Sequence, residues 1–161
     1  MPEFHARYCG EKPYFEFWDG QAVQKCSPTR LHSRVQYLLV QMLYALGFEA
    51  GSEITVKQAA GHELIPDVIA EEGAIGDPYP TEPFEMVAEI LSDDSFSRMF
   101  QKCELYAAWG IRQIVPIDLE TRLIWTWNRD SLRETDLIAR RCDQVITAQA
   151  LWADVDRLLQ R

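Results

Sequence analysis

The alternation of apolar and polar positions along the first third of the chain predicts a hairpin followed by a helix. Residues 14–18 and 21–25 are strand-like runs joined by an Asp-Gly dipeptide, which is a favoured two-residue hairpin turn. A helix is expected next, with Ser27 or Thr29 as its N-cap and Gly47 at its end. Its apolar residues recur at helical spacing: Leu31, Val35, Leu38, Leu39, Met42 and Leu46.

The middle of the chain reads as strands and a second helix. Residues 48–57 alternate toward a strand, and apolar runs at 64–70 and 86–91 predict two more. The segment between the two runs, 73–83, is rich in Gly and Pro and is expected to be a loop. A helix from about Ser95 to Trp109 follows, closed by Gly110.

The remaining residues predict strands and a closing helix. Strands are expected over 111–118 and 121–127, joined by a tight turn, and a poorly patterned stretch leads to Thr147, the expected N-cap of the last helix. The pattern favours an α/β (α+β) fold, with a mixed sheet flanked by helices and an N-terminal hairpin. We expect one domain over residues 1–161.

Two acids stand out because each lies at the centre of an apolar, strand-like run. Asp67 lies in 64–70 and Glu89 in 86–91. Burying either as an unpaired ion costs roughly 3–5 kcal/mol, so a cation, a proton or a fixed donor must compensate it. Pro66 removes a ladder donor, so the chain must bend or lie at a sheet edge beside Asp67. Lys102 follows on the next predicted helix.

The order Asp, Glu, Lys is what a metal-dependent phosphodiesterase requires. A hard cation such as Mg²⁺ prefers one or two carboxylates with waters and substrate oxygens, and it activates water and stabilises the developing oxyanion. Lys102 would orient that water. Taken singly, each residue has a plainer interpretation: Asp67 as a turn cap, Glu89 as the partner of an arginine, and Lys102 as a solvated helix residue. Their joint order favours the site.

Composition and charge set limits on the partners. The formal net charge is −9. The whole excess of acidic over basic residues lies between Gln58 and Ser97, where ten acids occur without a Lys or Arg. This segment is either a solvated acidic loop or a field that attracts divalent cations, and it opposes unassisted binding to a polyanion. No apolar run approaches the roughly 20 residues that span a bilayer, and no secretory signal is visible. The four scattered cysteines form no Cys-x-x-Cys pair, which favours reduced thiols in a cytoplasm over a zinc cluster.

Several other residues are expected to be structural. His32, near the start of the first helix, is more typical of a capping or packing residue than of a ligand. Packing is also the default for four tryptophans in predicted elements, although an exposed one would be able to stack on a base. These are Trp109, Trp125, Trp127 and Trp152.

Three sequence segments resemble motifs of the Uma family of putative restriction endonucleases, within the PD-(D/E)XK nuclease-like superfamily. Glu16 with the following Asp-Gly turn, His32, and the run 113–118 also match, so the resemblance covers about residues 14–127. The three segments are Ile65-Pro66-Asp67-Val68, Val87-Ala88-Glu89-Ile90-Leu91-Ser92 and Lys102-Cys103-Glu104-Leu105-Tyr106-Ala107-Ala108-Trp109-Gly110-Ile111.

The resemblance implies roles for these residues. Asp67 and Glu89 would be ligands of Mg²⁺ (or Mn²⁺), and Lys102 matches a lysine that the family carries on the helix rather than two residues after the acid. Glu16 would complete the metal site or hold the hairpin. Relatives carry an Asp four residues before the lysine, where this chain has Arg98, which would remove an orienting partner or add a phosphate contact. Tyr106 shares the helix face of Lys102.

The expected function is therefore a metal-dependent endonuclease that hydrolyses phosphodiester bonds of nucleic acid, with DNA favoured. It would act as a cytoplasmic homodimer and not at a membrane. The alternative is a catalytically inactive nuclease fold that serves as a binding or assembly module, which the acidic charge, Arg98 and the lack of a basic cluster favour. The distinguishing feature is whether Asp67, Glu89 and Lys102 converge in an open cleft.

Overall fold

The structure, a computed structural model, describes residues 3, 4, 7, 14–25, 27–58, 61–91 and 96–160. Its helices and strands are β1 (Phe15–Trp18), β2 (Gln21–Gln24), α2 (Arg30–Leu46), β3 (Glu49–Ser52), β4 (Val56–Lys57), β5 (Glu63–Leu64), β6 (Val68–Glu71), β7 (Met86–Leu91), α3 (Phe96–Trp109), β8 (Gln113–Asp118), β9 (Trp125–Asn128), β10 (Ser131–Glu134), β11 (Leu137–Arg141), β12 (Gln144–Thr147) and α4 (Ala148–Leu159).

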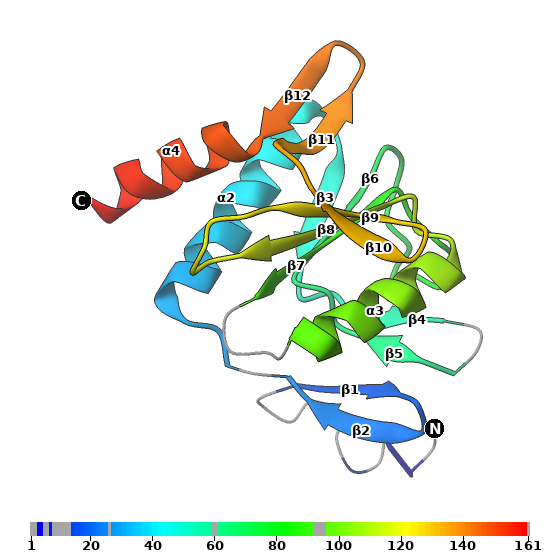
Figure 1. Cartoon of the computed structure of the whole chain (residues 1–161). Coiled ribbons are helices and arrows are strands. Elements are labelled where there is room, and N and C mark those ends of the chain that lie inside the picture. The colour runs from blue at the N-terminus through cyan, green and yellow to red at the C-terminus, as the bar shows by residue number, and fades with distance from the viewer. Residues whose placement is uncertain are drawn as a thin grey trace.

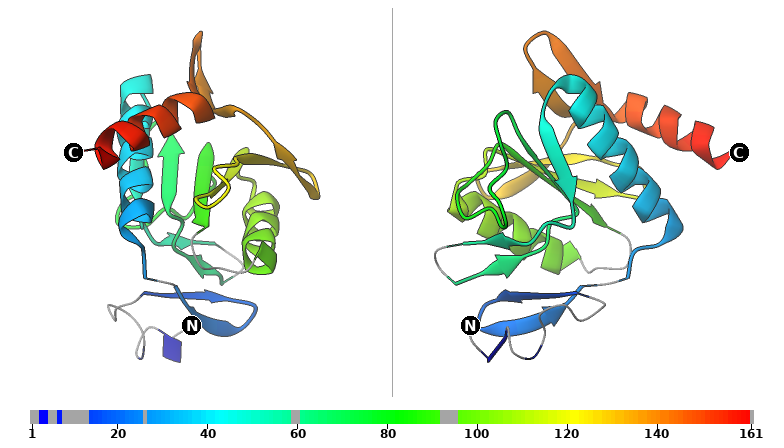
Figure 2. Two further views of the ribbon diagram at one scale, coloured as in Figure 1. Left: turned by 60° about the vertical axis from the view of Figure 1, so that its left-hand side comes forward. Right: turned by 180° about the vertical axis from the view of Figure 1, so that it is seen from behind.

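The centre of the molecule is a mixed sheet with strand order β3-β6-β7-β8. The pairs β3–β6 and β6–β7 are antiparallel, whereas β7 and β8 run parallel, with α3 as the crossover between them. The helices α2 and α3 lie on opposite sides of this sheet (Figures 1 and 2). The expected mixed sheet flanked by helices is therefore confirmed.

Alternation along the strands divides the core between the two faces of the sheet. On β7, Met86, Ala88 and Ile90 pack with α2 and α4, whereas Val87 packs on the other face with the buried side of α3. Glu89 follows Val87 by two residues on β7, so both side chains point to the same face of the sheet. The Glu89 carboxylate therefore lies on the α3 face, where Lys102 is also buried.

The N-terminal hairpin forms at the expected turn and lies beside β5. Asp19 and Gly20 have φ of 50° and 71°, the two left-handed positions that an Asp-Gly hairpin turn uses. β1 pairs with β2 and touches β5 through Phe17 opposite Glu63. In Figure 1 the hairpin, in blue, lies across the end of the molecule where α3 begins.

The caps of α2 and α4 are as the sequence predicts. The Thr29 hydroxyl accepts the His32 N–H, and the Thr147 hydroxyl accepts the Ala150 N–H. Gly47 ends α2 at φ 92°, and a Cβ there would meet the Arg141 guanidinium at 2.2 Å. The left-handed conformation favours glycine at this position, whereas the Arg141 guanidinium is the far end of a flexible side chain and can shift.

Three expectations about elements are wrong. Asp67 does not lie in a strand: β5 ends at Leu64, the chain bends at Asp67, directly after Pro66, and β6 begins at Val68. Residues 48–57 form two short strands, β3 and β4, that belong to different sheets. The poorly patterned stretch after Trp127 contains most of two hairpins, β9–β10 and β11–β12.

Three residues named in the sequence analysis, Cys9, Cys26 and Ser92, lie outside the described residues. Of the other two cysteines, Cys103 is a buried free thiol and Cys142 is an exposed one. Within the described ranges, no helix has the length and apolar character to cross a membrane.

Candidate active site

Asp67 is buried, with only 2% of its surface exposed, and it contacts three separate elements. Its Oδ2 accepts the Ile90 N–H at 2.7 Å, which ties it to β7. Its Oδ1 lies 2.7 Å from Lys25 Nζ and 3.3 Å from His32 Nε2. Its backbone carbonyl accepts from Gln36 Nε2 at 2.8 Å. The bend at Asp67 thus places one carboxylate in contact with the hairpin, α2 and β7 together.

Glu89 and Lys102 form a buried ion pair across the sheet–helix interface. Lys102 Nζ lies 2.7 Å from Glu89 Oε1 and 3.0 Å from Glu16 Oε1. The Tyr106 hydroxyl, one turn further along α3, donates to Glu89 Oε1 at 2.5 Å. The i, i+4 spacing of Lys102 and Tyr106 directs both side chains at one carboxylate.

The two acids are neighbours across β6 and β7. Val68 lies opposite Ala88 in the antiparallel register, so Asp67, one residue earlier, faces Glu89, one residue later. The hydrogen bond from the Ile90 N–H to Asp67 links the two positions directly. Asp67 lies just outside the paired strands, so the sequence-based expectation that the two carboxylates sit on neighbouring strands holds for Glu89 and not for Asp67.

The N-terminal hairpin contributes one residue of each charge. Glu16, on β1, is 3% exposed, and its Oε1 accepts the Ile65 N–H at 2.8 Å in addition to its pair with Lys102. Lys25, just after β2, donates to the Ile65 carbonyl at 2.8 Å in addition to its pair with Asp67. Both alternatives for Glu16 are therefore compatible with its position, since it holds the hairpin and touches the lysine of the cluster.

Burial and the neighbouring charges shift the pKa values of the acids in opposite directions. Burial alone raises the pKa of Asp67, but Lys25 and then His32 outweigh it and hold that pKa below its ordinary value. Burial raises the pKa of Glu89 to about 7: Lys102 opposes this, while Asp67 and Glu16 add to it. Glu89 thus takes up a proton near neutrality, whereas Asp67 stays ionised.

The two donors beside Glu89 keep their protons. Burial works against the charge of Lys102, but Glu16, Glu89 and Asp67 surround it and raise its pKa above the ordinary value. Burial, followed by the charge of Glu89, raises the pKa of Tyr106 well above 10. Lys102 therefore remains an ammonium ion and Tyr106 a hydroxyl donor.

Asp67, Glu89 and Lys102 converge, but not in an open cleft. Glu89 is 6% exposed and Lys102 5%, so neither points into solvent. Arg98, the third residue of the predicted helix face, is half-buried one turn before Lys102. Lys102 has Glu16 and Glu89 as partners, so Arg98, in place of the Asp expected from the resemblance, does not leave it without an orienting acid.

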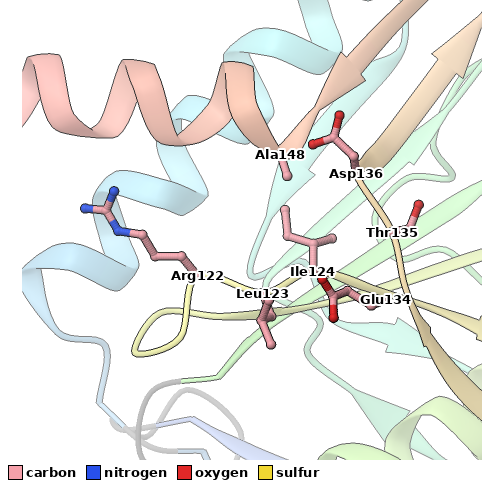
Figure 3. A pocket seen from close by; sticks show the side chains of 7 residues that line it. All are labelled: Arg122, Leu123, Ile124, Glu134, Thr135, Asp136 and Ala148. Atoms are coloured by element: carbon pink, nitrogen blue, oxygen red, sulfur yellow. The ribbon is translucent and has the colours of Figure 1, made fainter.

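A cavity of about 360 Å³ lies away from this cluster, between the β9–β10 hairpin and the start of α4 (Figure 3). Two of its polar lining groups are engaged in structure. Asp136 accepts the Ala148 and Gln149 N–H groups at the start of α4, and Arg122 forms a two-pronged pair with Asp156. None of Asp67, Glu89 and Lys102 lines it.

Sequence reasoning missed Lys25 and Gln36 and gave His32 a structural role. His32 and Gln36 are four residues apart on the buried side of α2, and two polar residues within that apolar face were the available signal. His32 Nε2 lies 3.3 Å from Asp67 Oδ1, and His32 Nδ1 has no hydrogen-bond partner among the described groups. Lys25 gave no signal, since its partner lies more than forty positions further along the chain.

The four tryptophans pack, as expected. Trp152 is buried in the core between α2 and α4. The rings of Trp109, Trp125 and Trp127 make edge-on contacts with Phe84, Phe96 and Phe100, respectively. Trp109, Trp125 and Trp127 are thus half-buried against phenylalanine rings, whereas Trp152 is a core residue.

The fold is that of a nuclease-like protein of known structure. The crystal structure of a putative nuclease belonging to DUF820 from Anabaena variabilis ATCC 29413 matches with a TM-score of 0.78 and 17% identity, covering 90% of this chain and 93% of that one. A cryo-electron microscopy structure of a DrdV–DNA complex matches at a TM-score of 0.42 and 19% identity, covering 76% of this chain and 10% of that one, which is too slight to support an argument. No curated protein matches.

The chain belongs to the Uma2 family, whose description is "Putative restriction endonuclease". The family model matches residues 1–151. The resemblance inferred from the three segments is therefore confirmed.

Proposed function

We propose that this protein is a metal-dependent endonuclease that hydrolyses phosphodiester bonds of DNA, with Asp67 and Glu89 as the metal-binding carboxylates and Lys102 as the group that orients the attacking water. The observation that supports this most strongly is the convergence of the three side chains from a bend, a strand and a helix. Family membership supports the reaction class.

The donor set fits a hard divalent cation. Asp67, just before β6, is hydrogen-bonded to β7, the strand that carries Glu89, and Asp67 Oδ1 lies beside the Lys25 ammonium and His32 Nε2, so a cation is already placed at this oxygen. Among the described residues, no group of three His, Cys, Asp or Glu side chains is arranged as a metal cluster. Mg²⁺ suits such a site because it keeps several waters and needs only one or two carboxylates, and Mn²⁺ has the same preference for oxygen.

The remaining residues have roles that follow from their contacts. A divalent cation held by the two acids would activate water and neutralise charge that develops on the phosphate. Lys102 keeps its proton beside Glu89, so it acts as a donor that positions the water and stabilises the transition state, not as a base. Tyr106 fixes the orientation of Glu89, and Glu16 fixes that of Lys102.

The substrate and assembly belong to the same proposal. The preference for DNA follows from the restriction-endonuclease family, and a homodimer would supply the two sites that cutting both strands requires. The acidic segment between Gln58 and Ser97 implies that binding to DNA depends on metal and on salt concentration. We propose a cytoplasmic location for such an enzyme.

One observation favours a second function, an inactive nuclease fold that serves as a binding or assembly module. Both carboxylates already have an ammonium partner, Lys25 for Asp67 and Lys102 for Glu89, and all four side chains are largely buried. Such a cluster would be able to stabilise a scaffold without binding metal or substrate.

Titration of the whole chain with Mn²⁺ by calorimetry separates the two functions. We expect wild-type protein to bind Mn²⁺ and to nick supercoiled plasmid DNA, and we expect both properties to be lost in Asp67→Asn and Glu89→Gln. Asn and Gln keep the shape and remove the charge.

The matched control is Glu85→Gln, which removes a carboxylate from the same acidic segment. Glu85 pairs with Arg112 at the surface and touches none of the three residues. The control should bind and cut as wild type does. Folded wild-type protein without Mn²⁺ affinity or DNA cleavage would favour the inactive scaffold.

A further inference from the structure

The hairpin places a cation of the protein's own on Asp67. Lys25 Nζ lies 2.7 Å from Asp67 Oδ1 and donates to the Ile65 carbonyl at 2.8 Å. The Lys25 side chain is 12% exposed. The ammonium is therefore shielded from water and held by two oxygens of the segment that leads into β6.

Asp67 has one carboxylate oxygen available for a cation. Oδ2 accepts the Ile90 N–H, a backbone donor fixed within β7. Oδ1 is the oxygen beside which Lys25 and His32 lie. Mg²⁺ binds oxygen at about 2.1 Å, so a metal on Oδ1 would lie within a few ångströms of the ammonium and repel it. Lys25 and a metal therefore compete for one atom.

The hairpin is attached to the rest of the protein at points other than the Lys25 ammonium. The Lys25 N–H donates to the Tyr14 carbonyl, next to the paired strands. Glu16, on the other strand, accepts the Ile65 N–H and contacts Lys102. The side chain of Lys25 can consequently leave Asp67 while Glu16 keeps the hairpin in place.

We propose that Lys25 is a built-in competitor that lowers the affinity of Asp67 for divalent cations, so that metal binding requires its ammonium to swing away. This inference rests on the proposed function, which places the metal on Asp67. The apparent dissociation constant is the intrinsic one divided by the fraction of molecules whose site is free. If Lys25 covers Asp67 in about nine molecules of ten, removing the ammonium strengthens binding about tenfold.

The test compares Mn²⁺ binding to wild type, Lys25→Met and Lys57→Met by calorimetry on the whole chain. Methionine keeps an unbranched apolar side chain and removes the charge. Lys57→Met changes the net charge equally, but Lys57 pairs with Glu63, at 3.6 Å, and does not contact Asp67. We expect the Mn²⁺ dissociation constant to fall about tenfold or more in Lys25→Met and to stay within about twofold of wild type in Lys57→Met.

The outcomes distinguish this inference from the proposed function. Equal or weaker Mn²⁺ binding by folded Lys25→Met, with binding by wild type that Asp67→Asn abolishes, overturns the competitor and leaves the metal site standing. No Mn²⁺ binding by wild type or Lys25→Met overturns the metal site, and the competitor with it. If Lys25→Met does not fold, Lys25→Gln is measured in its place, with the same tightening expected.

Discussion

Lys102 Nζ and the Tyr106 hydroxyl meet on a single atom, Oε1 of Glu89, at 2.7 and 2.5 Å. One carboxylate oxygen of the central sheet thus receives two polar contacts from α3, in addition to the apolar packing of that helix on the sheet. Every change at Glu89 consequently acts on stability and on the candidate chemistry together.

Removing the ammonium of Lys102 should destabilise the protein more at high pH than at low pH. Lys102→Met leaves Glu16 and Glu89 buried beside each other without their cation, and breaking a buried pair costs about 3–5 kcal/mol. Below the pKa of Glu89 a proton removes one of the two charges and the cost shrinks. Urea unfolding at pH 5 and pH 8 measures the difference, and an equal loss at both values would contradict the prediction.

Glu89 should make the metal-free protein less stable as the pH rises. Its pKa goes from 4.5 to about 7 on folding, so the folded state binds the proton more tightly between these values. The stability it contributes is complete below about 4.5 and is lost as the pH passes through about 7. The unfolding free energy of wild type relative to Glu89→Gln should therefore fall by about 3 kcal/mol between pH 4.5 and pH 8.

Urea unfolding in the presence of a chelator checks this dependence. Asp67 does not obscure it, because its lowered pKa gives stability that is lost only as the pH falls below its unfolded value of 3.8. A difference between wild type and Glu89→Gln that is constant from pH 4.5 to pH 8 would show that Glu89 is not protonated in the folded protein.

Tyr106→Phe should raise the pKa of Glu89 further. The hydroxyl donates to the carboxylate and so stabilises its ionised form, and the ring alone cannot. The lost hydrogen bond to a charged group should also cost roughly 1.5–3 kcal/mol of stability when Glu89 is ionised. The chemical shift of the Glu89 side-chain carbon, followed by NMR through a pH titration, measures the change. A midpoint at or below that of wild type is the contrary result.

Glu16→Gln should move the same midpoint in the opposite direction. The charge of Glu16 repels Glu89 and raises its pKa, so an uncharged side chain of the same shape lowers it. The Gln carbonyl oxygen can still accept the Ile65 N–H, which keeps the hairpin attached. The same NMR titration serves, with Glu85→Gln as a control that should leave the midpoint in place. A raised midpoint in Glu16→Gln would mean that Glu16 acts mainly through Lys102.

Capping and turn residues made α2 and the first hairpin predictable from sequence. The later hairpins were not predicted because they lack comparably strong turn residues. Thr29 and Gly47 mark the ends of α2, and Asp19-Gly20 marks the first turn. The turns of β9–β10 and β11–β12 instead place Arg129 and Cys142 at φ of 63° and 52°. Arginine and cysteine rarely adopt this conformation, so the signal there was limited to the Asn and Asp residues beside Arg129 and Cys142, without the Asp-Gly pair that marks the first turn.

The acids and the lysine of the candidate site were predictable, whereas their surroundings were not. Asp67 and Glu89 conflict with their apolar neighbours, and a local conflict of this kind is visible in sequence. Lys25 conflicts with nothing near it, because its partner is brought to it by tertiary structure. The burial of the whole cluster has the same origin, since the hairpin covers residues distant in the chain.

The hairpin also has a consequence for the order of folding. Glu16 reaches Ile65 across 49 positions, and Lys25 reaches the same residue across 40. During synthesis both charges appear on the hairpin well before Asp67, Glu89 and Lys102 exist to neutralise them. The loops that bring them together lose entropy on closing, so these contacts form late. The candidate chemistry is therefore expected to assemble only after the local β1–β2 hairpin and the α2 helix have formed.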